Sequence, residues 1–140
     1  MRLYLYLSLL CLFASSEIKA LPSDLSINHS GIVQGDSIKE YRASYIYLNG
    51  LKLDSTQIDS LQALIIQSYQ EGRPFQELVE AYNMDSRGGD LGWFRAKIFV
   101  KAFVEAVDEH QKGEIFTVDI PAYHWYYVVL KTHDSRWVEE

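Results

Sequence analysis

The sequence predicts a single α+β domain in which a small, mostly antiparallel sheet is covered by helices. Tracts rich in aromatic and β-branched residues stand near the start and the end of this domain, which is typical of strands. Between them, apolar residues recur at the three- and four-residue spacing of amphipathic helices. A glycine cluster within 88–92 divides the helical part, so the predicted order is β-α-α-turn-α-β-β.

The opening strand spans residues 39–49. Successive side chains alternate between two faces, which is the period of two expected for a strand, and aromatic residues are frequent among them. The pair Asn49-Gly50 is a typical turn sequence and closes the strand.

Two helices are expected after this strand. Residues 55–71 carry apolar side chains at helical spacing, and either Asp54 or Ser55 can cap the N-terminus. Residues 74–83 form a second, shorter helix with a proline in its first turn. We interpret the apolar stripe of each helix as the side that packs on the sheet.

The second half of the domain starts with the glycine turn at 88–92. A third helix is expected from about 99 to 110, because its apolar residues again have helical spacing. Two strands follow, at 115–120 and 125–133, and the last is strongly branched and aromatic.

The N-terminal residues predict a cleaved secretory signal peptide. The apolar run at 3–13 is too short to cross a bilayer but has the length of a signal core. Small residues at 14–16 and at Ala20 offer two cleavage sites. Lipidation of Cys11 is disfavoured because Leu10 stands where a small residue is expected. The expected location is therefore secreted or periplasmic, without a stable membrane span.

This gives four segments along the chain. Residues 1–20 are the signal peptide, and residues 21–38, rich in Ser, Asp, Asn and Gly, are a flexible leader. The folded domain is expected to cover 39–134, and 135–140 would be a C-terminal tail.

Composition narrows the possible functions. The chain has 140 residues with 48% hydrophobic and 23% charged residues, which fits one globular domain. A formal net charge of −6 argues against nucleic acid as a partner, since such binders concentrate positive charge. A single cysteine permits no disulfide within the chain, and the scattered histidines lack zinc-ligand spacing. We therefore expect no metal and no cofactor.

Several segments occur in an order shared with one known family. They are YRASYIYL, FQELVEAYNMD, GGDLGWF, FVEAV, KGEI and HWYYVVLK. Together they resemble the parvulin-type (PpiC-type) peptidyl-prolyl cis-trans isomerases, or rotamases. The resemblance covers about 40–134, and the Gly-Asp-Leu-Gly-aromatic-Phe turn between these neighbours is its most specific part.

The resemblance implies an apolar socket for a substrate proline. The glycine turn and the helix after it would build this socket, with Leu91, Phe99 and Phe103 as its walls. Phe99 stands where the family usually has Met, a flexible residue, so the socket is expected to be stiffer.

The resemblance also implies a polar floor beneath the socket. The family normally places two histidines there, with a Cys or Asp nearby. In this sequence Tyr45 and Tyr126 occupy the two histidine positions, and Asp85 occupies the Cys/Asp position.

The implied function is a parvulin-type isomerase that assists the folding of exported proteins by rotating X-Pro bonds. Its partners would be unfolded or extended proline-containing polypeptides. A phosphopeptide preference is not expected, because the stretch after the first strand offers Lys52 alone as a cation. The loss of both histidines leaves an alternative open, a non-catalytic peptide-binding chaperone or adaptor on the same scaffold.

Overall fold

The computed structural model describes residues 35–140, and these residues form the α+β domain that the sequence predicts. The expected signal peptide at 1–20 and the part of the leader up to residue 34 lie outside the described residues.

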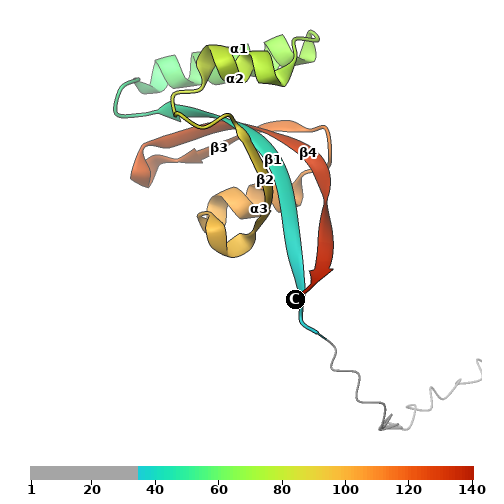
Figure 1. Cartoon of the computed structure of the whole chain (residues 1–140). Helices are drawn as coiled ribbons and strands as arrows, with labels where there is room; N and C mark the ends of the chain where they lie inside the picture. The colour runs from blue at the N-terminus through green and yellow to red at the C-terminus, as the bar shows by residue number, and fades with distance from the viewer. Residues whose placement is uncertain (1–34) are drawn as a thin grey trace, which may run out of the picture. The chain divides into compact units, whose positions relative to one another are not determined.

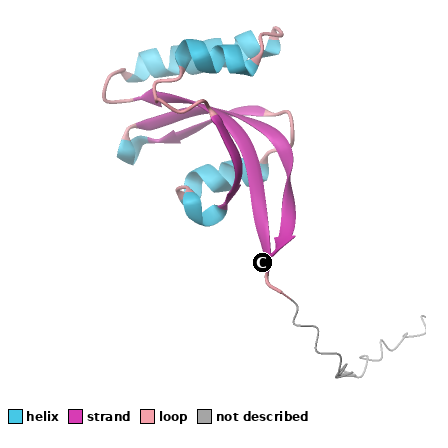
Figure 2. Ribbon diagram, in the orientation of Figure 1, coloured by secondary structure: helices cyan, strands magenta, loops and turns pink. Residues whose placement is uncertain are grey.

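A four-stranded antiparallel sheet forms the centre of the domain (Figures 1 and 2). Its strands are β1 (Ser37–Asn49), β2 (Asp90–Arg95), β3 (Ile115–Ile120) and β4 (Trp125–Glu139). The order across the sheet is β2-β1-β4-β3, so β1 and β4 are the two inner strands. All three pairings are antiparallel, and β1 pairs with β4 from Ser37↔Glu139 to Asn49↔Trp125.

Helices cover both faces of the sheet. Figure 1 shows α1 (Ser55–Gln70) and α2 (Phe75–Tyr82) on one face and α3 (Lys101–Glu109) on the other. Two short 3₁₀ helices, η1 (Ala96–Ile98) and η2 (Pro121–Tyr123), lie in the connections before α3 and before β4.

The alternation of side chains along the strands separates two cores. Tyr41, Ala43 and Tyr45 of β1 point to the α3 side, whereas Ile46 and Leu48 point to the side of α1 and α2. Successive residues of a strand face opposite sides of a sheet, so a period of two assigns each residue to one core. Both sides of β1 and β4 are therefore buried where the helices cover them.

The start of α1 confirms one of the two predicted caps. The Asp54 side chain accepts a hydrogen bond from the Gln57 amide at 2.8 Å, and Gln57 Oε1 accepts one from the Asp54 amide at 3.0 Å. This reciprocal capping box satisfies two backbone donors at the helix terminus. Further along α1, the buried Gln62 Nε2 donates to Asp119 Oδ1 at 2.8 Å and ties the helix to β3.

Strand β2 was not predicted from the sequence, because it looked like part of the glycine turn. It is short, and its pairing contains a bulge, since Arg42↔Trp93 is followed by Ser44↔Asp90. The extra residue interrupts the alternation, so Leu91 and Phe94 both pack against the α3-side core. A period-two pattern is therefore absent from the sequence of this strand.

Three other boundaries differ from the prediction. The helix expected from about 99 begins at Lys101, and η1 precedes it. The expected tail at 135–140 is part of β4 as far as Glu139, and β1 begins at Ser37 instead of Lys39. These strand ends contain many polar residues and are held by pairing with each other, which is a long-range contact that local hydrophobicity does not reveal.

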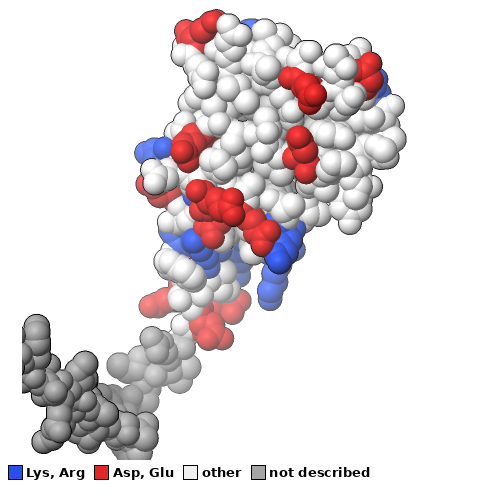
Figure 3. Space-filling view, turned by 180° about the vertical axis from the view of Figure 1, so that it is seen from behind, with Lys and Arg blue, Asp and Glu red and all other residues white. Residues whose placement is uncertain are grey.

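Ion pairs gather at this end of β1 and β4. Glu40 accepts hydrogen bonds from Arg136 at 2.9 Å and from Arg95 at 3.5 Å, and Arg136 lies 3.8 Å over the Trp93 ring. The two arginines hold the pKa of Glu40 below its usual range. In Figure 3 basic and acidic side chains intermingle in the lower part of the domain, whereas the upper part shows scattered acidic side chains and few basic ones.

Gly89 lets the loop between α2 and β2 approach β1. Its carbonyl accepts a hydrogen bond from the Tyr45 amide at 2.8 Å, and its φ of +82° lies in the left-handed region. A Cβ at this position would lie 2.8 Å from Val79 Cγ1 and 2.9 Å from the Tyr45 carbonyl oxygen. Space and backbone conformation therefore both require glycine here.

We expect Gly89→Ala to lower the free energy of unfolding by at least about 1–2 kcal/mol, the approximate cost of a left-handed backbone for an L-residue. Gly88→Ala is the matched control, because a Cβ there meets nothing within 4 Å and should change stability by less than about 0.5 kcal/mol. Urea unfolding of both variants measures the difference. Equal midpoints would show that the close approach at Gly89 is not needed.

Candidate functional site

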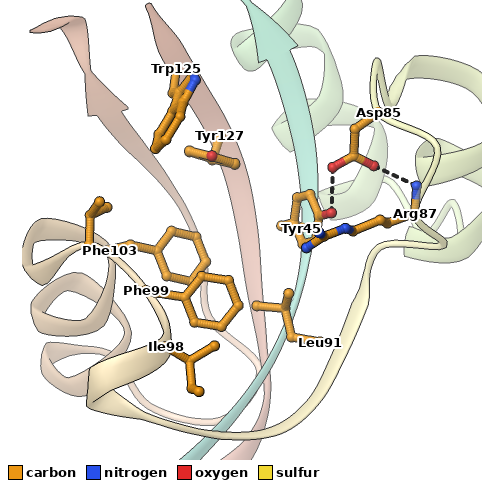
Figure 4. Close-up of a pocket in the computed structure, with 10 residues that line it drawn as sticks. Tyr45, Asp85, Arg87, Leu91, Ile98, Phe99, Phe103, Trp125 and Tyr127 are labelled. Carbon is orange, nitrogen blue, oxygen red and sulfur yellow. Dashed lines mark hydrogen bonds between the residues drawn. The ribbon is translucent and has the colours of Figure 1, made fainter. Parts of the chain in front are cut away.

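A cavity of about 400 Å³ opens between the α3 side of the sheet and the segment from η1 to α3 (Figure 4). Sites for small ligands usually measure about 300–1,000 Å³, so the cavity can hold a single side chain or ring with part of its backbone. The residues that line it come from β1, β2, β4, the α2–β2 loop and the η1–α3 segment: Tyr45, Asp85, Arg87, Leu91, Ile98, Phe99, Val100, Phe103, Trp125 and Tyr127.

One wall of the cavity is apolar and largely aromatic. The rings of Phe99 and Phe103 have centroids 5.4 Å apart, and Phe103 meets Tyr127 edge-to-face at 5.4 Å. Phe94 meets Phe99 edge-to-face, with centroids 4.8 Å apart, and supports it from the sheet side. Leu91 completes this wall, so the structure brings together all three residues expected to form the socket. Phe103 is only 2% exposed and also belongs to the core.

The opposite side of the cavity is polar. The Tyr45 hydroxyl donates to Asp85 Oδ2 at 2.5 Å, and Asp85 Oδ1 accepts from the Arg87 amide at 2.8 Å. Asn83 Nδ2 also donates to Asp85 Oδ1 at 3.0 Å. The expected neighbours Tyr45 and Asp85 therefore do meet at the cavity, with the carboxylate held by three donors.

Asn83 positions the loop that carries this carboxylate. Its Oδ1 accepts from the Tyr47 amide at 2.9 Å, and its Nδ2 donates to the Arg87 carbonyl at 2.8 Å as well as to Asp85. One side chain thus links β1 to both ends of the Asp85–Arg87 turn. Sequence reasoning missed this role, although an Asn directly after a helix is a common anchor for a turn.

Tyr126 does not lie at the cavity, which corrects the sequence-based expectation of a Tyr45–Tyr126 pair. Its ring packs with the core on the α1–α2 side and lies over Gly50, where a Cβ would stand 2.6 Å from Tyr126 Cε2. Tyr127 faces the cavity instead and meets Tyr45 edge-to-face at 5.9 Å. A register error of one residue places a side chain on the wrong face of a sheet.

The alternation along β4 could have revealed this. Val129 packs into the α3-side core, so Tyr127 and Trp125, two and four residues earlier, share its face. The structure places both of them at the cavity.

The hydroxyls of the two cavity tyrosines differ in their partners. Tyr45 is committed to Asp85, whereas the Tyr127 hydroxyl has no hydrogen-bond partner within residues 35–140. Burial raises the pKa of Tyr127 to about 12, with smaller contributions from Tyr47 and Asp85. Burial, followed by the bond to Asp85, raises the pKa of Tyr45 still further. Both phenols are therefore neutral hydrogen-bond donors across the physiological pH range.

A family profile described as "PPIC-type PPIASE domain" matches residues 33–133, which is more than half of the chain. The chain belongs to the PPIC-type peptidyl-prolyl isomerase family. This membership confirms the resemblance seen in the sequence and agrees with the fold described above.

Individual relatives support the assignment. The chain is 31% identical over 108 residues to the chaperone SurA of Alkalilimnicola ehrlichii, covering 73% of this chain and 25% of the relative. It is 35% identical over 83 residues to a probable parvulin-type peptidyl-prolyl cis-trans isomerase of Bordetella pertussis, covering 54% of this chain and 31% of the relative. The chain thus spans a quarter to a third of the length of these relatives.

A solved structure shows the same fold. The crystal structure of a PpiC-type peptidyl-prolyl cis-trans isomerase domain superimposes with a TM-score of 0.62 at 21% identity, over 73% of this chain and 94% of that domain. At this identity the likeness concerns the fold alone.

Two further observations concern residues 35–140. No helix there has both the length and the apolar character needed to cross a membrane. The same part of the chain contains no cluster of three or more His, Cys, Asp or Glu side chains suited to a metal ion.

We expect the free energy of unfolding to fall as the pH rises above about 10, where phenols of the unfolded chain ionise. The folded protein keeps its proton on Tyr127 up to about pH 12, so the unfolded chain binds fewer protons in this window. Tyr127→Phe removes the contribution of this residue to the difference in bound protons and should make the decline less steep. Tyr123→Phe, on the exposed η2 segment, controls for loss of a hydroxyl. Urea unfolding at several pH values gives the slopes; parallel slopes for Tyr127→Phe and wild type would contradict the prediction.

Proposed function

We propose that this domain is a peptidyl-prolyl cis-trans isomerase acting on unfolded or extended polypeptides after export, with the cavity as its proline socket. One observation above all supports this proposal: the free hydroxyl donor of Tyr127 lies at the same cavity as an apolar wall of Leu91, Phe99 and Phe103. The apolar wall offers a place for the proline ring, and the donor lies where an adjoining carbonyl can reach it.

The chemistry requires no nucleophile, metal or cofactor. Resonance holds the peptide bond planar with a rotation barrier of about 18–20 kcal/mol. A site accelerates rotation when it binds the twisted amide more tightly than either planar isomer. Partial desolvation in an apolar socket disfavours the charge-separated planar form, and a fixed donor can bind the carbonyl oxygen as it turns.

The two cavity tyrosines would then have different roles. Tyr127 has a free, neutral hydroxyl and would donate to the substrate carbonyl oxygen. Tyr45 and Asp85, already bonded to each other, would hold the floor of the socket and the α2–β2 loop in place. This proposal replaces Tyr126 with Tyr127 and retains Tyr45 and Asp85 as site residues.

Exposed apolar side chains at the rim support a polypeptide as the ligand. Ile98 is 69% exposed at one side of the cavity, and Tyr123 and Trp125, with ring centroids 4.8 Å apart, are exposed near the other. Such side chains can contact the chain on both sides of a bound proline. The turn after β1 offers Lys52 alone as a cation and therefore supplies no basic cluster for a phosphate group.

A second function, peptide binding without catalysis, uses the same socket. It is favoured by the commitment of the Tyr45 hydroxyl to Asp85, which leaves one free phenol donor at the cavity. Only the isomerase function predicts that binding accelerates rotation of the X-Pro bond.

The first experiment measures cis-trans exchange in short X-Pro peptides by NMR, with and without the purified protein. We expect exchange faster than in the peptide alone. Phe99→Ala should weaken peptide binding about tenfold or more, because truncating an aromatic anchor commonly costs about 2 kcal/mol. Leu51→Ala removes a side chain that is 76% exposed in the turn after β1 and is the matched control. Phe99 is the better target, since Phe103→Ala would also open the core.

Unchanged peptide affinity in Phe99→Ala would place the binding site elsewhere. Peptide shifts without faster exchange would assign the binding function and reject the isomerase.

A separate variant tests the proposed donor. Tyr127→Phe should reduce the acceleration of exchange about tenfold, because one neutral hydrogen bond to the twisted amide is worth roughly 1.4 kcal/mol. Peptide affinity should change much less. Tyr126→Phe is the matched control on the opposite face of β4 and should keep the wild-type exchange rate. Equal losses in the two variants would remove Tyr127 from the mechanism.

A further inference from the structure

A second cavity continues from the socket along β2. It measures about 490 Å³ and shares Arg87, Leu91, Ile98 and Phe99 with the first. Strand β2 is an edge of the sheet, so this cavity is open along the side of the domain. An extended chain with its proline in the socket can therefore place a neighbouring residue in the second cavity, and Arg87 stands at the junction.

The other charged side chains around the two cavities are already engaged. Asp90 pairs with Arg42 at 3.0 Å, and Arg95 pairs with Glu40. The Asp85 carboxylate accepts three hydrogen bonds from within the protein, from Tyr45, Asn83 and the Arg87 amide.

The Arg87 guanidinium differs from these groups. Within residues 35–140 it forms no salt bridge, in contrast to Arg42, Arg73, Arg95 and Arg136. Its side chain is exposed and extends from the α2–β2 loop past the Tyr45 ring at the cavity (Figure 4). The unsatisfied charge that a ligand meets between the two cavities is therefore positive, although the chain as a whole is acidic.

We infer that the site prefers substrates with a side-chain carboxylate, Glu or Asp, next to the proline. The inference rests on the proposed peptide site and adds a substrate class to it. A guanidinium pairs with a carboxylate through two parallel hydrogen bonds, which a neutral amide cannot match. Because Arg87 belongs to the Asp85–Arg87 turn anchored by Asn83, its backbone is held in place before a ligand arrives.

The test uses matched acetylated and amidated peptides, so that no terminal carboxylate is present. Each carries Glu, Gln or Lys directly before or directly after a single proline, and NMR titration with the purified protein gives its affinity. With the wild type, the peptide that carries Glu in one of the two positions should bind about two- to fivefold more tightly than the matching Gln peptide, which is the range expected for an exposed ion pair. The matching Lys peptide should bind more weakly than the Gln peptide. High salt should reduce this ratio toward one.

Arg87→Gln should bring the Glu-to-Gln affinity ratio to about one. Lys112→Gln is the matched control, because it removes the same charge from the exposed turn before β3 and should keep the wild-type ratio. A ratio near one in the wild type at both positions, or a preference that survives in Arg87→Gln, would overturn the inference. Binding of the Gln peptides without any charge preference would reject this inference alone, whereas no binding of any peptide would reject the proposed function as well.

Discussion

The antiparallel pairing of β1 with β4 is the constraint on which the rest of this domain depends. The two strands are the inner pair of the sheet and are paired along nearly their whole length. Because neighbouring residues of a strand face opposite sides, the register of this pair decides which side chains meet α1 and α2 and which meet α3. It is this register that brings Tyr45 and Tyr127 together under one cavity and sends Tyr126 to the other core.

The α2–β2 loop adds the polar side of the site to this frame. Gly89 allows the loop to approach the backbone of Tyr45, and Asn83 fixes the loop to β1 through the Tyr47 amide. The loop positions both Asp85 and Arg87 at the cavity. Only the Asp85 carboxylate has hydrogen-bond partners within the described residues. The resulting division of roles is physical: bonded groups hold the shape of the site, and groups without internal partners remain for a ligand.

The absence of histidine from the residues that line this cavity is compatible with isomerisation. Rotation of an amide exchanges no proton with the solvent and breaks no σ bond, so a site needs shape, low polarity and a donor more than it needs an acid or a base. Both cavity phenols remain neutral far above physiological pH, and the Tyr127 hydroxyl supplies such a donor without a titration near pH 7. The domain therefore combines a partly aromatic cavity on a family scaffold with polar groups of its own.

The sequence by itself determined the α+β class, the opening strand, the two helices after it, and five of the six expected site residues. Periodicity and the glycine-rich turn are local signals that predict the elements, whereas the resemblance to the family implied Tyr45, Asp85, Leu91, Phe99 and Phe103, which the structure brings to the cavity. Tertiary structure alone decided the rest. The bulge in β2 hides that strand from any period-two pattern, and the polar ends of β1 and β4 are strands only because they pair with each other. The role of Tyr127, one residue away from the expected Tyr126, depends on strand register, which is fixed by long-range contacts between the strands and the two cores.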